Sequence, residues 1–336
     1  ATGELVIPDT IEGNPVTSIG GSAFWQNTGL TRVIIPNGVT SIGYGAFGGC
    51  SGLTEMAIPD TVTSIDDAAF YNCTSLTSIT IPDSVTSIGF DGITLGVFRG
   101  CSSLTEITIP NSITRLEDDT FWGCSALTSI TIPSSVTSIG SNTFFACSGL
   151  TEITIRDTVT SIGDGAFVGC TSLTAIIIPD SITELGSFAF ENCESLNEVT
   201  LGSGITAIPD GCFRDCTSLT NITVPAGVNS IGASAFLQCS SLSSIVFMGP
   251  APITVGVDAF AGVASDAIVV VEAETRPSFG FIGTNWNGLI VTCNSGDLCR
   301  LNWTTINGEV TITDCDPSAT GELVIPDTIE GNPVTS

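Results

Sequence analysis

The chain repeats one 23-residue pattern along most of its length, and this period constrains the fold more than any other feature. The step between equivalent leucines is 23 residues except once, where five extra residues near 90–94 make it 28. A fixed period of this size is typical of a solenoid. One such unit has too little apolar surface to fold alone, so each must stack on its neighbours. The marker residues are Leu30, Leu53, Leu76, Leu104, Leu127, Leu150, Leu173, Leu196, Leu219 and Leu242.

Each unit contains the signals of two short strands and a tight turn. In the unit that starts at Leu127, Ile130 and Ile132 alternate with a polar residue, as in a strand with one buried face. Pro133 has no N–H to give to a ladder and should end that strand. Residues 136–139 form a second extended piece, and the segment before Cys147 predicts one helical or 3-10 turn. The predicted fold class is therefore a leucine-rich-repeat-type solenoid of mostly short parallel β-strands, with one such turn per repeat and capped ends.

The repeated pattern Leu-Thr-x-Ile-x-Ile-Pro-x-x-Val-Thr-x-Ile-Gly-x-x-Ala-Phe-x-x-Cys resembles the BspA-like leucine-rich repeats of bacterial and protist surface proteins. The resemblance covers about residues 5–245. It implies an extracellular, non-enzymatic protein involved in adhesion or surface architecture. It implies no particular ligand.

The pattern divides the chain into four parts. Residues 1–245 form the solenoid array of about ten turns, and residues 246–292, where the pattern decays, are its expected C-terminal cap. A cap is expected because the last turn would otherwise expose apolar core and strand edges. Residues 293–300 are a predicted linker. In 301–336, two alternating segments around Asn307–Gly308 predict a hairpin cap, followed by the first turn of the next copy.

Residues 319–336 repeat residues 1–18 without a single change. A natural tandem repeat or an engineered duplication would both give this identity, and we expect the former, with a unit that recurs every 318 residues. The predicted partners are therefore further copies of the same chain, arranged head to tail. No signal peptide is visible, so we expect these residues to be an internal part of a longer protein.

The charge balance excludes several classes of partner. The chain has 34 acidic residues and seven arginines, with no lysine or histidine, which gives a net charge of −27. Nucleic acid and anionic membranes attract basic surfaces and would be repelled. No stretch approaches the ~18 apolar residues of a membrane span. We therefore expect an extracellular or cell-surface protein that binds, if anything, another surface protein or a glycan. In a eukaryote, the sequons at Asn72, Asn221 and Asn302 would be glycosylation candidates.

Catalytic patterns are missing from the sequence. Without histidine there is no Ser-His or Cys-His pair and no imidazole metal ligand. The glycines mark repeat corners and form no phosphate-binding fingerprint. Two acidic pairs, Asp66–Asp67 and Asp118–Asp119, stand at the turn before the core phenylalanine, with nothing to suggest a cleft. We predict that the chain is not an enzyme and has no cofactor.

Nine of the thirteen cysteines occupy one repeat position. Stacked residues lie within disulfide range, but their side chains run parallel, so we expect a ladder of reduced, buried thiols. A metal site needs converging ligands, which a ladder does not provide. Cys299 and Cys315 flank the predicted hairpin, and we predict a disulfide between them, with Cys293 unassigned. The ladder cysteines are Cys50, Cys73, Cys101, Cys124, Cys147, Cys170, Cys193, Cys216 and Cys239.

One acidic column carries aspartate three residues before the core phenylalanine on alternate turns: Asp67, Asp118, Asp164 and Asp210. Two rungs separate neighbouring charges, about 9.6 Å at the strand spacing. That is close to the Debye length of roughly 10 Å at 0.1 M salt. The column can serve solubility without repulsion, or it can bridge calcium, and both interpretations stay open.

A second column directly follows the core phenylalanine, and its character varies from turn to turn. Its aromatic members Trp25, Tyr71, Trp122 and Phe145 are candidates for ligand binding or self-contact, or they shelter the turn beneath them. Phe90, in the inserted loop, is a further contact candidate. Two functions follow: a structural rod or filament segment, or alternatively an adhesin or ligand-binding module.

Overall fold

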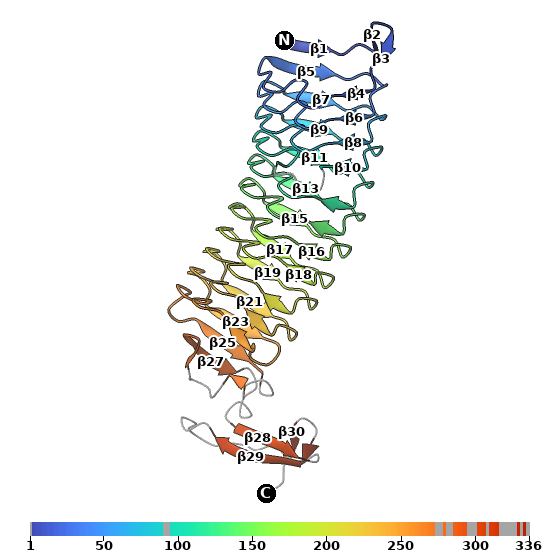
Figure 1. The fold of residues 1–336 in the computed structure, drawn as a ribbon. Helices are drawn as coiled ribbons and strands as arrows, with labels where there is room; N and C mark the ends of the chain where they lie inside the picture. Colours follow the sequence, from blue (N-terminus) through green and yellow to red (C-terminus); the bar gives the residue numbers. More distant parts are fainter. Residues whose placement is uncertain are drawn as a thin grey trace.

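The computed structural model shows a long stack of coils with a hairpin beyond its C-terminal end (Figure 1). It describes residues 2–89, 95–272, 278–279, 285–293, 301–306, 309–315, 328–329 and 332–333. Each coil contributes a strand to a first ladder, a shorter strand to a second ladder, and a turn segment that contains the core phenylalanine. The predicted solenoid of parallel strands is confirmed.

The first ladder is built from strands of three to five residues near the start of each coil. They are β1 (Gly3–Val6), β5 (Leu30–Ile34), β7 (Glu55–Ala57), β9 (Ser78–Thr80), β11 (Glu106–Thr108), β13 (Ser129–Thr131), β15 (Glu152–Thr154), β17 (Ala175–Ile177), β19 (Glu198–Thr200), β21 (Asn221–Val224), β23 (Ser244–Phe247), β25 (Ile268–Val271) and β27 (Leu289–Cys293).

The second ladder consists of two-residue strands before each corner. They are β4 (Ser18–Ile19), β6 (Ser41–Ile42), β8 (Ser64–Ile65), β10 (Ser87–Ile88), β12 (Arg115–Leu116), β14 (Ser138–Ile139), β16 (Ser161–Ile162), β18 (Glu184–Leu185), β20 (Ala207–Ile208), β22 (Ser230–Ile231) and β24 (Thr254–Val255). At the end of the first ladder β26 (Asn285–Trp286) pairs antiparallel with β27. Outside the ladders lie β2 (Thr10–Ile11), β3 (Asn14–Pro15), β28 (Leu301–Ile306), β29 (Glu309–Cys315), β30 (Thr328–Ile329) and β31 (Asn332–Pro333).

The register of both ladders follows the sequence period. Ile130 pairs with Ile153 in the first ladder, and the second ladder has the same 23-residue offset. Across the insertion Ile79 pairs with Ile107, 28 positions later, so the extra residues leave the core register intact. Residues 90–94, and Phe90 with them, lie outside the described residues. The first ladder is interrupted between β11 and β13, between β15 and β17, and between β19 and β21.

The core consists of one leucine, several β-branched residues and one phenylalanine per coil, nearly all fully buried. The phenylalanine rings form a continuous stack from Phe24 to Phe260, with neighbouring centroids 5.2–5.7 Å apart and ring planes within 12°. Such contacts add about 0.5–1.5 kcal/mol each beyond area burial. Because every ring packs on the next coil, no coil has a complete core of its own.

No turn segment among the described residues contains a helix, so the predicted helical or 3-10 turn is wrong in this detail. The residues two before and two after the core phenylalanine have positive φ in every described turn segment except at Gly96, as at Ala68 (56°) and Asn72 (52°) around Phe70. A helix needs consecutive negative φ values. The N–H of Phe70 donates to the following coil, to the Val97 carbonyl at 3.0 Å, while the Tyr71 N–H bonds within its own turn. The segment is therefore a series of tight turns that is hydrogen-bonded to the next coil.

All nine ladder cysteines are buried and unpaired, as the sequence predicts. Each thiol donates to the carbonyl of the core phenylalanine one coil earlier, at Sγ–O distances of 3.0–3.3 Å. In the first turn segment Asn27 replaces cysteine. The ladder thiols are thus small apolar groups that also satisfy a buried carbonyl.

The two ends of the array differ. At the C-terminal end, Trp286 packs edge-on against Phe247 (5.4 Å) and tilted against Phe260 (5.9 Å), which covers the last ring of the stack. At the N-terminal end, Phe24 is only half-buried. The five-residue excess of the first coil forms the small hairpin β2–β3, whose turn at Glu12 and Gly13 has positive φ at both positions.

Beyond β27, strands β28 and β29 pair antiparallel, with Trp303 opposite Ile312. Cys299 lies outside the described residues, so its bond to Cys315 stays a prediction. The duplicated segment pairs in the same way at both places: Thr10 with Pro15 in β2–β3, and Thr328 with Pro333 in β30–β31.

The buried thiols predict a loss of stability in alkali. Burial raises the pKa of Cys101, Cys147 and Cys193 from 9.0 to about 12. Because the unfolded thiols ionise first, the free energy of unfolding should be constant below pH 9 and fall as the pH rises toward 12, by about 1.4 kcal/mol per pH unit for each thiol. Urea unfolding at pH 8.0, 9.5 and 10.5 measures this slope.

Cys147→Ala is the matched control. It removes one titrating thiol, so it should reduce the slope of the free energy of unfolding against pH by the contribution of one thiol. Thiol labelling of the folded chain should leave the ladder unmodified at pH 8. Rapid labelling without denaturant, or the same stability at all three pH values, would contradict this account.

Candidate functional site

The column that follows the core phenylalanine begins with a stacked aromatic pair. Trp25 lies flat over Gly48, where a Cβ atom would come within 2.2 Å of the indole. Trp25 thereby reaches past one coil and stacks on Tyr71, with centroids 6.1 Å apart and planes 1° apart. Trp25 is 37% exposed, so one face of the pair is open to solvent.

A second cluster lies further along the same column. Trp122 stacks on Phe145 at 4.1 Å, and the Arg99 guanidinium lies 3.9 Å from the centre of the Trp122 ring. Arg99 also forms an ion pair with Asp119. Burial raises the pKa of the Asp119 carboxyl, and the nearby Arg99 charge acts in the opposite direction. The stacked rings and the ion pair hold Arg99 against Trp122, so this part of the column packs on itself.

Further along, Val168 is buried and Glu191 forms an ion pair with Arg214 at 3.5 Å. The aromatic and charged side chains of the column therefore contact a residue one or two coils away. The four predicted aromatic residues fall into two separate pairs and form no single patch.

The aspartate column binds backbone N–H groups of the following coil. Asp118 Oδ1 accepts from Ser141, Asp164 Oδ1 from Ser187, and Asp210 Oδ1 from Ala233, each at 2.7 Å. The fourth member, Asp67, is buried with 5% exposure. Among the described residues, no group of three or more acidic or cysteine side chains could hold a metal ion. The structure does not bring the calcium candidates together, and it gives three of them a structural role that the sequence did not reveal.

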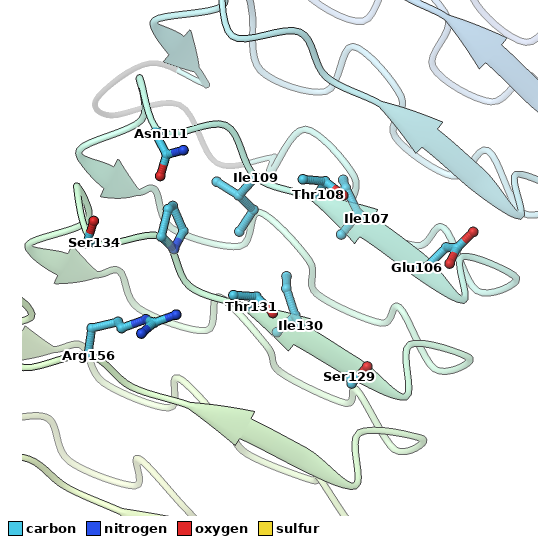
Figure 2. Close-up of a pocket in the computed structure, with 11 residues that line it drawn as sticks. Glu106, Ile107, Thr108, Ile109, Asn111, Ser129, Ile130, Thr131, Ser134 and Arg156 are labelled. Atoms are coloured by element: carbon cyan, nitrogen blue, oxygen red, sulfur yellow. The ribbon is translucent and has the colours of Figure 1, made fainter.

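A crevice of about 490 Å³ lies on the first ladder where the ladder is interrupted between β11 and β13 (Figure 2). Its walls carry hydroxyl and amide groups, with isoleucine and proline between them, and Glu106 lies at one end. Arg156 enters from the neighbouring coil, and its Nε donates to the Ile132 carbonyl at 3.3 Å. The polar lining residues are Thr108, Asn111, Ser129, Thr131 and Ser134.

Arg156 differs from the other arginines of the described chain because it forms no ion pair there. Arg32, which lines two smaller hollows on the same ladder, is paired with both Glu4 and Glu55 at 3.3 Å. The crevice can therefore accept an anionic group. Sequence reasoning missed it, although one signal was present: Arg156 stands where the coils on either side have proline.

Comparison with known proteins connects this architecture to a family. A model of the BspA type leucine-rich repeat region, in six copies, matches residues 17–150, 90–169 and 145–265. A leucine-rich repeat protein from Bacteroides ovatus is 27% identical over 87% of this chain and 92% of its own, with a TM-score of 0.51. No helix in the described ranges is long and apolar enough to cross a membrane.

Two further structures are similar. A leucine rich cell surface protein from Faecalibacterium prausnitzii is 28% identical over 88% of this chain and 89% of its own, with a TM-score of 0.45. The pneumococcal vaccine antigen PcpA is 18% identical over 88% and 84%, with a TM-score of 0.52, which is a likeness of fold. The comparison with curated proteins found no match.

The aspartate contacts predict a specific cost of removing one carboxylate. Asp164→Ala should destabilise the chain by about 1 kcal/mol, because the Ser187 N–H loses its acceptor. Asp164→Asn keeps an oxygen acceptor and should cost less. Thermal unfolding of both variants checks the order. An alanine variant as stable as the native chain, or one less stable than native only when calcium is present, would refute the structural role.

Proposed function

The chain belongs to the BspA-type leucine-rich repeat family, and from this premise we propose that it is a non-catalytic structural segment of a rod. Copies of the segment are joined head to tail, at or beyond the cell surface. The surface location comes from the family resemblance. The −27 charge supports it by disfavouring contact with nucleic acid.

The observation that carries the proposal is the duplicated segment and its identical strand pairing. Residues 1–18 and 319–336 have one sequence, and the hairpin β2–β3 reappears as β30–β31 with equivalent partners. The first of these hairpins opens an array, so the second is suited to open another. A solenoid stiffened by inter-coil bonds on three sides provides the rigidity that a rod needs.

The test is the shape of a protein that carries two consecutive 318-residue copies followed by residues 1–18. We expect its maximum dimension in small-angle scattering to be about twice that of the single chain, because the coil axes continue. A matched protein with residues 293–318 of the first copy replaced by a Gly/Ser linker should show a broad range of shapes instead. A two-copy protein folded back on itself, with the dimension of one copy, would refute the rod.

A ligand-binding module is the second candidate, and the crevice at Arg156 favours it. An unpaired guanidinium beside several hydroxyl groups suits a ligand that combines a carboxylate with hydroxyls, such as an acidic sugar. The walls carry no aromatic ring, so binding would depend on hydrogen bonds and charge.

Galacturonate is the probe for this site, with uncharged galactose as the comparison ligand. We expect galacturonate to bind more tightly than galactose, and Arg156→Gln to weaken galacturonate binding at least tenfold in titration calorimetry. Arg32→Gln is the matched control, since Arg32 is already paired with two glutamates, and it should leave binding unchanged. Equal binding of both sugars, or no binding of either, would remove the crevice as a ligand site.

A further inference from the structure

At the N-terminal end of the array, the first ladder ends in a strand with one unpaired edge. Strand β1 pairs with β5 and, among the described residues, with no other strand. Its alternate N–H groups are divided between two sides: the Ile7 N–H donates to Ile34 at 3.0 Å, so those of Glu4 and Val6 point away from β5. Val6 is 58% exposed, and Leu5 and Ile7 are only partly buried. An edge with free backbone groups and apolar residues is a template for another strand.

The chain carries a strand that fits this edge. The described part of β29 forms a ladder with β28 and with no other described strand, and β31 lies close to it without pairing. The copy of β1 begins at position 321, six residues after Cys315 at the end of β29. A connection of this length joins adjacent antiparallel strands in hairpins of about four or five loop residues.

The apolar residues of the two strands also match. Val310 and Ile312 alternate in β29, as Leu5 and Ile7 do at β1. In an antiparallel pair with Ile312 opposite Leu5, Val310 lies opposite Ile7, and the four residues share one face. The same register leaves a four-residue connection. At the other end of the array, by contrast, Trp286 already covers the last phenylalanine of the stack.

We propose that β29 of one copy pairs antiparallel with β1 of the next, so that the β28–β29 hairpin closes the N-terminal end of each array. This inference rests on the proposed head-to-tail function and names the surface that joins the copies. The first ladder then begins β28–β29–β1–β5, with one antiparallel junction before the parallel strands.

The experiment uses the full 336-residue chain with residues 301–318 added in front of Ala1, compared with the unextended chain. Both are measured by amide hydrogen exchange at a concentration where light scattering shows monomers. The extension should slow exchange of the Glu4 and Val6 amides at least tenfold, because they become hydrogen-bonded. The Ile7 amide, which is bonded already, should change much less.

Two matched extensions separate strand pairing from a general effect. An 18-residue Gly/Ser extension, and the native extension with Val310→Asp and Ile312→Asp, should both leave Glu4 and Val6 exchanging as in the unextended chain. Protection by either of them, or no protection by the native extension, overturns the proposal. This readout is local, so it can fail while two copies still form a rod, and a compact two-copy protein can still show the strand pairing.

Discussion

The fold depends on a buried carbonyl whose second hydrogen bond only a neighbouring coil can supply. The oxygen of Phe47 accepts one bond from the Cys50 N–H in its own turn and a second from the Cys73 thiol of the following coil. A carbonyl oxygen has two lone pairs, and a typical hydrogen bond contributes about 0.5–1.5 kcal/mol to stability. Serine would bring a stronger donor but a more polar group into the stack, and alanine would leave the second bond unmade. The repeat thus keeps a small apolar side chain with a weak donor at this position.

Most of the fold could be predicted from the sequence, because the repeat shows which residues of neighbouring coils contact each other. The period predicts which residues are stacked, and the alternation at Ile130 and Ile132 predicts which face is buried. What could not be predicted depends on bonds that a local pattern does not contain. The turn before Cys147 matches a helical turn in length, but its N–H groups donate to the next coil, and this forces positive φ where a helix needs negative φ. Gly165 and Asn142 at those positions were the available hint.

In the candidate sites, too, the local sequence pattern does not show the contacts between coils. Four aspartates were recognised as a column, but the partners of three of them are backbone N–H groups 23 residues away, which carry no side-chain signal. Part of the variable column reflects compensation between coils: Trp25 is accommodated because Gly48 has no side chain beneath it. At a different repeat position, two residues before the core phenylalanine, Phe188 lies over Gly211 in the same way. A ring that lies flat over the next coil, as Trp25 and Phe188 do, needs a glycine there, whereas Trp122 stacks on the ring of Phe145 instead.

The turn segments also give the molecule an electric dipole along the solenoid axis. In the strand ladders N–H groups point both ways, as Thr54 donates backward to Thr31 and Ile7 forward to Ile34. In the turn segments the inter-coil bonds between backbone groups run forward, as from Phe24 to Ala46 and from Phe236 to Ala259, whereas the N–H groups of Ser141, Ser187 and Ala233 donate backward to aspartate side chains. Aligned peptide units of about 3.5 D each sum along an axis, as they do in a helix. One side of the solenoid is therefore a macrodipole, positive toward the C-terminal end, and two molecules lying side by side would be favoured antiparallel.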